Sequence, residues 1–497
     1  MASTTGIATY SWPARDEFVN RNGDLHAMEQ WWDSPTRDSL ALLGRRRVGK
    51  SWLFRAFAHD KPAIILVADR VVTGTQMARF AEQLEPLLGV RPDLPDVASL
   101  LRTLYRLGSE RKLLAVIDEF PYLLPDGTAR EQVLTEIQAV MEDERESSRT
   151  KLALCGSLIG QMESLLAEKS PISGRLRRLD IWPMTFGEAR PLMRHEEPPA
   201  ARVERYAVTG GMARHLAELG DDAPVRDLVC GRVLNRRGPL FDDPRSVLEQ
   251  ELRAPATYFS ILEELADNAA QLEHLSKALG VAGKQLTPYL DTLREMRLIS
   301  ASLPVGAPKD ARTRKFRIDD GFIRFWFRFV FPNQESLQAG LRPDDLWDGD
   351  IAVHLSDHVS PTFEDLCVRW TRLRYGAEAQ SVGGWWGNAL NAHRQAGTRT
   401  TEEVDVVGTY RKQLRIVGEC KWTDPPMHQS VLNDLQTFKL PAIEQEKRLK
   451  IPKAGPRVLL FSKSGFSTDL AAAAEKDEQV TLVPVEQVVN DLEVAGQ

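Results

Sequence analysis

The sequence is poor in cysteine. Its 497 residues contain four cysteines, and no two of them form a C-x-x-C pair. Disulfide-rich secreted scaffolds need many cysteines and structural zinc sites commonly use closely spaced pairs, so four scattered cysteines argue against both. The four are Cys155, Cys230, Cys367 and Cys420.

Long apolar runs are also lacking. The most aromatic stretch, from Phe322 to Phe331, is interrupted by Arg324 and Arg328 and is too short to span a bilayer. The opening residues, MASTTGIATYSWPARDEF, lack the basic start and apolar run of a secretory signal. We expect a cytoplasmic protein with no membrane partner.

No excess of one charge marks the chain as a whole. It has 64 Lys and Arg against 70 Asp and Glu, a net charge of -6, so any contact with nucleic acid must be local. No short repeat or low-complexity tract is evident. The length suggests about three domains.

What is present first is a phosphate-binding motif. The segment LALLGRRRVGKSWLFRAFA matches G-x-x-x-x-G-K-[ST], between an apolar strand and a helical pattern. Backbone N–H groups of such a loop bind phosphates, Lys50 reaches the β- and γ-phosphates, and Ser51 can ligate Mg²⁺. The expected nucleotide-binding residues here are Gly44, Arg45, Arg46, Arg47, Val48, Gly49, Lys50 and Ser51.

Two later strands end in polar residues. The strand from Leu113 to Ile117 is followed by Asp118, expected to hold Mg²⁺, and by Glu119, expected to activate the attacking water. A helix cap is the alternative for these acids. The next strand, KLALCGS, ends with Ser157, which we place near the γ-phosphate.

A basic segment follows these strands. Arg175, Arg177 and Arg178 lie close together in SPISGRLRRLD, and we favour Arg175 as the arginine that neutralises charge on the transferred phosphoryl group. The alternative is a solvated basic turn.

From about Val247 the pattern predicts a winged helix. Two amphipathic stretches in LEHLSKALGVAGKQLTPYLDTLREMRLIS flank a glycine-containing turn, and the strands RLISASLPV and RKFRIDD follow as the wing. A lid that transmits nucleotide state is the alternative to DNA contact. The expected DNA contacts are Lys284, Gln285, Lys309, Arg312, Arg314 and Lys315. The aromatic FIRFWFRFVF helix after them is expected to be a core.

The C-terminal region carries a third group of residues. SPTFEDLCVRW predicts a helix capped by Ser360 with Pro361 in its first turn, and Glu364 can approach a sheet edge. The strands EEVDVVG and LRIVGECKW predict a hairpin, with a turn at residues 410–413, that brings Asp405 within reach of Glu419.

These side chains have the chemistry of a cation site. Carboxylates of Asp405 and Glu419 with the carbonyl of Cys420 suit Mg²⁺ or Mn²⁺, and Lys421 could orient the attacking water. The alternative is an intrastrand pair worth about 0–1 kcal/mol. Trp385 and Trp386 are expected in a core rather than stacked on bases. Nearby basic residues are Arg369, Arg372, Arg374, Arg394, Arg399, Lys412 and Arg415.

Several motifs in order resemble the archaeal-type DEXX-box ATPases, which are related to AAA and signal-transduction P-loop ATPases. They are GRRRVGKS, VIDEF, CGS, SPISGR, TGGMARHL and FVNRNGDL. The resemblance implies that Asn20 and Arg21 lie near the adenine and that Gly210 and Gly211 open a lid.

The segments FEDL, VGGWWGN, EEVDVVG, GECKW and VLLFSKSGF resemble the C-terminal domain attached to these ATPases and the PD-(D/E)XK nuclease superfamily. This resemblance implies Glu364 as the helix acid, Asp405 and Glu419 as metal acids, and Lys421 as the catalytic lysine. Val404 stands where the pattern has proline.

The expected fold is α/β and multidomain: a P-loop RecA/AAA-like parallel-sheet ATPase, a winged helix, and a restriction-endonuclease-like mixed α/β domain. The expected boundaries are 1–190 for the ATPase core, 191–245 for a helical lid, 246–331 for the winged helix, 332–359 for a linker and 360–497 for the nuclease-like domain.

We expect ATP and DNA as partners, with nucleotide state controlling a metal-dependent nuclease. One alternative is a nucleotide-switched DNA- or protein-binding module with a degenerate nuclease fold. Another is a remodelling ATPase, which would require assembly into a homo-oligomer.

Overall fold

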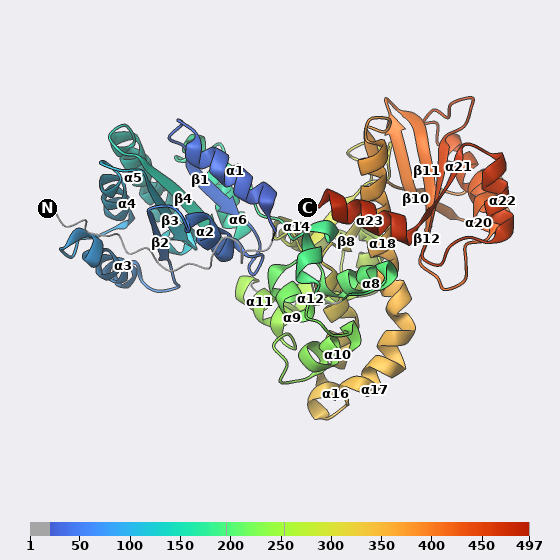
Figure 1. Ribbon diagram of the computed structural model, residues 1–497, viewed down its shortest axis with the longest axis horizontal. Helices are drawn as coiled ribbons and strands as arrows, with labels where there is room; N and C mark the ends of the chain where they lie inside the picture. The colour runs from blue at the N-terminus through green and yellow to red at the C-terminus, as the bar shows by residue number, and fades with distance from the viewer. Residues whose placement is uncertain (1–19, 195, 253, 497) are drawn as a thin grey trace. The chain divides into compact units, whose positions relative to one another are not determined.

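The computed structural model describes residues 20–194, 196–252 and 254–496 (Figure 1). They form two compact units, the first comprising residues up to Pro183 with Met212–Arg214, and the second Met184–Gly211 with the chain from His215 onward. Residues 1–18, in which the sequence predicts no secretory signal, lie outside the described residues. Phe18 and Val19 of the FVNRNGDL motif lie outside them as well. No helix within the described ranges is long and apolar enough to cross a membrane.

The first unit is built on a five-stranded parallel sheet in the order β2-β3-β4-β1-β5, as predicted. Every residue of β1, β3 and β4 is buried, which is typical of parallel strands covered on both faces. The strands are β1 (Ser39–Leu43), β2 (Ala63–Val67), β3 (Leu113–Asp118), β4 (Thr150–Gly156) and β5 (Leu176–Asp180).

Two apolar cores flank this sheet because successive strand residues point to opposite faces. In β1, Leu40 and Leu42 pack with α1 and α2, whereas Ala41 and Leu43 pack in the core formed with α3 to α6. The helices are α1 (Asn22–Asp33), α2 (Lys50–Ala58), α3 (Thr73–Leu88), α4 (Val97–Leu107), α5 (Thr128–Arg145) and α6 (Ile159–Leu166).

The second unit contains the two helices and two strands predicted for a winged helix, and a further helix and a short strand, which were not predicted, precede them. Gly280 ends the first of the two predicted helices at φ +64°, and the three strands form an antiparallel sheet in the order β6-β8-β7. The elements are α12 (Ala256–Asp267), β6 (Ala270–Gln271), α13 (Leu272–Leu279), α14 (Gly283–Glu295), β7 (Ile299–Ser302) and β8 (Lys315–Ile318).

Shorter helices precede the winged helix in this unit. They are α7 (Phe186–Ala189), α8 (Pro199–Thr209), most of α9 (Ala213–Leu219), α10 (Val225–Val229) and α11 (Asp243–Glu251). The predicted lid glycines lie between α8 and α9: Gly210 has φ +61°, and a Cβ at Gly211 would lie 2.0 Å from the Met184 carbonyl oxygen.

The aromatic segment forms a core, as predicted. It comprises α15 (Gly321–Phe325) and the π-helical turn η6 (Trp326–Val330), whose apolar side chains are all buried. Trp326 Nε1 donates to the Phe241 carbonyl oxygen at 2.8 Å, so the buried indole keeps a hydrogen bond.

The helix start predicted at Ser360 is wrong. One helix, α18 (Ala352–Tyr375), runs through this position with Pro361 inside it. Tertiary packing overrides the local break signal: Val359 and Phe363 are fully buried on either side of the proline, and Arg324 Nη2 donates to the His358 carbonyl oxygen at 2.5 Å. The expected linker is also helical, with α16 (Gln334–Ala339), α17 (Pro343–Leu346) and the π-turn η8 (Trp347–Ile351).

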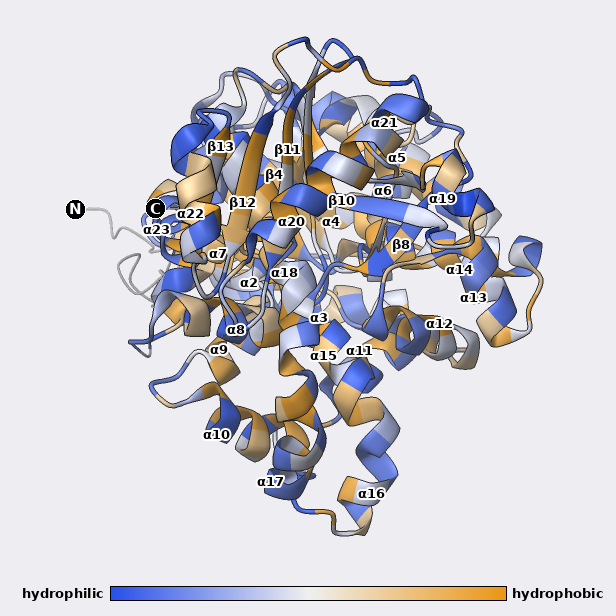
Figure 2. Cartoon of the chain, turned by 90° about the vertical axis from the view of Figure 1, so that its right-hand side faces the viewer, coloured by the Kyte–Doolittle hydropathy of each residue, from blue (hydrophilic) through white to orange (hydrophobic). Residues whose placement is uncertain are grey.

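The C-terminal sheet is mixed, in the order β13-β12-β11-β10-β9. Strands β9, β10 and β11 are antiparallel, and β11, β12 and β13 are parallel. In Figure 2 the central strands β11 and β12 are mostly hydrophobic, in agreement with their burial. The strands are β9 (Ser381–Asn388), β10 (Thr401–Tyr410), β11 (Gln413–Lys421), β12 (Arg457–Ser462) and β13 (Val480–Pro484).

The predicted hairpin is confirmed as β10 and β11. Its turn contains Arg411 and Lys412 at φ +48° and +64°, the two positive φ values of a type I′ hairpin turn. The remaining helices of this domain are α19 (Asn391–Gln395), α20 (Gln429–Asp434), α21 (Leu440–Gln445), α22 (Thr468–Lys476) and α23 (Val485–Ala495).

Candidate functional site

The phosphate-binding loop joins β1 to α2 in the first unit. Gly44 admits no side chain, because a Cβ there would lie 2.8 Å from the Ile181 carbonyl oxygen, and Gly49 has φ +103°. Lys50 begins α2, and its Nζ donates to the carbonyl oxygens of Gly44 at 2.6 Å and Arg45 at 3.0 Å. The loop therefore has the backbone and the lysine position that phosphate binding needs.

Positive charge is concentrated at this loop. Arg45, Arg46 and Arg47 are partly buried, and Val48 is fully buried. Burial, and then the charges of Arg214 and Arg46, lower the pKa of Arg47. Arg214 was not predicted as a site residue, although it lies in the TGGMARHL motif.

Four polar side chains meet where the parallel strands end. Ser51 Oγ donates to Asp118 Oδ2 at 2.8 Å, and the N–H of Glu119 donates to Asp118 Oδ1 at 3.0 Å. Glu119 Oε2 accepts from Ser157 Oγ at 2.8 Å and from its N–H at 3.1 Å. The structure therefore brings together the predicted Mg²⁺ ligands and the predicted base, and hydroxyl and carboxylate oxygens suit that ion.

Two arginines named from the sequence have defined contacts. Buried Arg21 donates from Nη2 to the Val48 carbonyl oxygen at 2.6 Å and from Nη1 to the Trp182 carbonyl oxygen at 3.0 Å. Arg175 donates to the Pro171 carbonyl oxygen at 3.1 Å and forms an ion pair with Glu142. The role of Arg175 toward phosphate stays a prediction.

In the C-terminal domain, the hairpin sets two carboxylates face to face. Val406 of β10 pairs with Gly418 of β11, so the same register places Asp405 opposite Glu419. The Cys420 N–H donates to Asp405 Oδ2 at 2.8 Å. The hairpin thus brings Asp405 within reach of Glu419, as the sequence predicted, and the ligand role of the Cys420 carbonyl stays a prediction.

Glu419 is 1% exposed, and its two carboxylate oxygens differ in their contacts. Oε2 accepts from Lys439 Nζ at 2.6 Å and lies 3.7 Å from Lys421 Nζ. Oε1 is buried and finds no hydrogen-bond partner among the residues that the structure describes.

Helix α18 adds Glu364 to this cluster. Burial, and then the charges of Asp405 and Asp365, raise the pKa of Glu364 to about 8. Burial, and then Asp405, raise the pKa of Glu419 to about 7, and burial raises the pKa of Asp405. Asp405 thus opposes the ionisation of both Glu364 and Glu419, and such coupled carboxyl groups in a buried region are typical of a functional site.

Lys421 keeps its charge beside these acids. Burial lowers the pKa of Lys421, but the charges of Asp405 and Glu419 raise it, and the net shift is upward. Its side chain is 38% exposed, so it stays accessible to solvent beside the buried carboxylate of Glu419.

No group of three or more His, Cys, Asp or Glu side chains within the described ranges is placed to hold a metal ion. The donor set still has the right chemistry, because Asp405 and Glu419 are hard oxygen ligands and Glu419 Oε1 has no other partner in the described chain. The divalent-cation site remains a prediction.

The residues predicted to contact DNA, two in α14 and four in the wing, lie in two environments. Lys284, Gln285, Lys309 and Arg312 are exposed, and Arg314 Nη2 donates to the Lys309 carbonyl oxygen at 3.2 Å.

Lys315, in contrast, forms an ion pair with Glu403 of β10 and lies 5.0 Å from the ring centroid of Trp386. Trp386 Nε1 donates to the Thr313 carbonyl oxygen at 2.7 Å, so this tryptophan holds the wing against β9. Trp385 is 2% exposed and lies in the core, as predicted.

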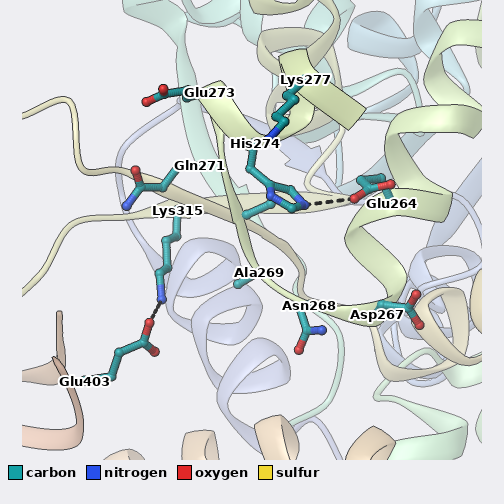
Figure 3. A pocket seen from close by; sticks show the side chains of 11 residues that line it. Glu264, Asp267, Asn268, Ala269, Gln271, Glu273, His274, Lys277, Lys315 and Glu403 are labelled. Carbon is teal, nitrogen blue, oxygen red and sulfur yellow. Dashed lines mark hydrogen bonds and ion pairs between the residues drawn. The ribbon is translucent and has the colours of Figure 1, made fainter. Parts of the chain in front are cut away.

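A pocket of about 620 Å³ lies beside Lys315, between the end of α12, β6 and α13 (Figure 3). Its lining is acidic overall, and His274 Nε2 lies 3.0 Å from Glu264 Oε1. Carboxylates repel phosphate, so the pocket does not extend a DNA-binding surface. Its acidic residues are Glu264, Asp267, Glu273 and Glu403.

Two family models match parts of this chain. Residues 36–190 match the model of an AAA domain. The first unit therefore contains a P-loop ATPase domain. Residues 326–435 of the second unit match a family described as "Archaea bacterial proteins of unknown function".

Two proteins of Methanocaldococcus jannaschii are similar to this chain. It is 25% identical over 415 residues to the uncharacterized protein MJECL04, covering 82% of this chain and 88% of that protein. Over 44 residues it is 41% identical to the uncharacterized ATP-binding protein MJ0423, covering 9% of this chain and 75% of that protein.

Solved structures resemble it more distantly. The Walker-type ATPase paby2304 of Pyrococcus abyssi gives a TM-score of 0.48 at 18% identity, covering 63% of this chain and 97% of that one. The ORC2 protein of Aeropyrum pernix gives 0.41 at 13% identity, covering 65% and 96%.

Proposed function

We propose that this P-loop ATPase domain controls a metal-dependent DNA nuclease centre in the C-terminal domain. The observation that carries the proposal is the hairpin geometry. It sets Asp405 opposite Glu419, with Lys421 3.7 Å from the Glu419 carboxylate. Glu364 joins them from α18 and shares their electrostatic environment.

The roles proposed in the ATPase domain follow from its contacts. Lys50 and the loop N–H groups would bind the β- and γ-phosphates, and Ser51 with Asp118 would hold Mg²⁺. Glu119, fixed by both hydrogen bonds from Ser157, would orient the attacking water. Arg175 would have to leave Glu142 to reach the transferred phosphoryl group.

The roles proposed in the nuclease centre follow from charge. Asp405 and Glu419, with the carbonyl of Cys420, would hold Mg²⁺ or Mn²⁺. Such a cation lowers the pKa of bound water and polarises the phosphodiester. Lys421 stays protonated beside these acids and would stabilise negative charge at phosphorus.

In this proposal, DNA contacts the exposed basic residues of the winged helix and extends to the nuclease centre. Lys284, Lys309 and Arg312 are exposed and suited to phosphate contacts, with Arg314 beside them. Lys315 would reach DNA only by leaving Glu403. Assembly of the ATPase into a homo-oligomer is part of the same proposal.

A second candidate is a nucleotide-switched module that binds DNA or a protein without cutting. Two observations favour it. No group of three potential ligands is placed for a metal in the described chain, and Glu419 is already paired with Lys439. Metal-independent DNA binding without nicking would support this candidate.

Incubation of the purified full chain with plasmid and single-stranded DNA tests the proposal. With ATP and Mg²⁺ or Mn²⁺, wild-type protein should cut, and Lys421→Ala should not cut but should hydrolyse ATP at the wild-type rate. Lys50→Ala should lose ATP hydrolysis. Lys453→Ala, at an exposed lysine of the same domain, is the matched control and should cut normally. Equal cleavage by wild type and Lys421→Ala would sink the nuclease claim.

A further inference from the structure

The proposed nuclease centre contains a second lysine that the hairpin motif does not include. Lys439 Nζ lies 2.6 Å from Glu419 Oε2, closer than Lys421 Nζ at 3.7 Å. The side chains of Lys439 and Glu419 are only 15% and 2% exposed. The charge of Glu419 is therefore balanced inside the domain by Lys439.

An irregular turn supplies this lysine. Lys439 ends the π-helical turn η9 (Leu435–Lys439), which interrupts the helical segment between α20 and α21. A π turn adds a residue to one helical turn and redirects the side chains near it, and such turns are frequent at functional sites.

Arg399 ties this turn to the strand that carries Asp405. It donates to Glu402 of β10 at 3.1 Å and to Asp434 at the end of α20 at 2.6 Å. Its guanidinium also lies 4.1 Å from the ring centroid of Phe438, the residue before Lys439. These contacts hold Lys439 in place relative to β10.

The other oxygen of Glu419 has no such partner. Oε1 is buried and finds no hydrogen-bond partner in the described part of the chain, an arrangement that is costly for a carboxylate. Lys439 thus satisfies one oxygen and leaves the second for another positively charged group.

We propose that Lys439 is the internal counter-ion of Glu419 and competes with a divalent cation for its carboxylate. The inference rests on the proposed nuclease centre and makes Lys439 a positioning residue within it. If the Lys439–Glu419 ion pair only stabilised the fold of the site, removing the charge of Lys439 would leave cation binding unchanged or weaken it.

Calorimetric titration of the full chain with Mn²⁺ alone, without nucleotide, separates these cases. Lys439→Met should bind Mn²⁺ at least about fivefold more tightly than wild type, because the competing charge is gone. Lys439→Arg keeps the charge and should bind as wild type does. Lys453→Met is the matched control at an exposed lysine and should also match wild type.

The same titration of Asp405→Asn shows which part of the binding heat comes from Mn²⁺ at this centre, because that part should be lost in the variant. A second readout is thermal unfolding, where Mn²⁺ should raise the midpoint of Lys439→Met more than that of wild type. If Lys439→Met does not fold, Lys439→Gln keeps an N–H donor without the charge and should shift the affinity in the same direction.

Unchanged or weaker Mn²⁺ binding by the uncharged Lys439 variants would overturn the inference and leave the proposed centre standing. A wild-type titration that Asp405→Asn does not alter would overturn the proposed centre, and this inference with it.

Discussion

Replacing Glu364 with glutamine should stabilise the protein at alkaline pH and much less at acidic pH. Burial, then Asp405 and Asp365, raise the pKa of Glu364 from its ordinary 4.5 to about 8 in the folded chain. A raised carboxyl pKa contributes stability that is complete below about pH 4.5 and is lost as the pH rises through 8. Glutamine keeps the shape of the side chain and removes the charge.

The magnitude follows from this shift. At about 1.4 kcal/mol per pKa unit, moving from 4.5 to about 8 corresponds to at most about 5 kcal/mol of unfolding free energy. In the variant, Asp405 and Glu419 ionise more easily without the neighbouring Glu364 charge, so the measured difference in unfolding free energy is smaller than this limit. Each kcal/mol should move the unfolding midpoint by about 2–4 °C.

Differential scanning calorimetry in EDTA, at about pH 5.5 and 8.5, measures the effect. The transition of the ATPase domain is identified by its shift with added nucleotide, because a ligand raises the midpoint of the unit that binds it. Glu475→Gln, at an exposed glutamate of the same domain, should change neither transition with pH. An equal gain for Glu364→Gln at both pH values would refute the reasoning.

Three further changes have defined outcomes. Ser51→Ala removes the hydroxyl that donates to Asp118 and should lower Mg²⁺-dependent ATP hydrolysis at least about tenfold in a phosphate-release assay, whereas unchanged turnover would contradict the assigned site. Arg399→Ala cuts the bridges to Glu402 and Asp434, and in urea unfolding it should cost about 1 kcal/mol, since the side chain is 35% exposed; no loss would count against the bridge. Trp386→Phe removes the hydrogen-bond donor to the Thr313 carbonyl oxygen and should speed proteolysis within the wing. Mass spectrometry of the fragments locates the cleavage sites, and a digestion pattern equal to that of wild type would contradict the prediction.

Local motifs were the most predictable part of the molecule. The glycines and lysine of the phosphate-binding loop act within one strand-loop-helix connection, so Gly44, Lys50 and Ser51 could be placed from spacing alone. Asp118 was placed by a similar rule, since parallel strands end at one edge of the sheet. The hairpin was predictable from two strands and a short turn.

Contacts set by distant segments were not predictable. Pro361 signals a helix start locally, but buried side chains on both sides of it keep α18 continuous. Lys315 belongs to a basic wing in the sequence, yet it pairs with Glu403, 88 residues away. Lys439 reaches Glu419 through a π turn, and no spacing rule indicates such a turn.

Plasmid integrity is the most direct test of the central claim. Wild type and Asp405→Asn are compared on supercoiled DNA with ATP and Mn²⁺, while ATP hydrolysis is followed in the same samples. The account predicts relaxed or linear plasmid with wild type, intact supercoils with Asp405→Asn, and equal ATP hydrolysis in both. Intact plasmid with a wild-type protein that binds DNA and hydrolyses ATP would contradict it.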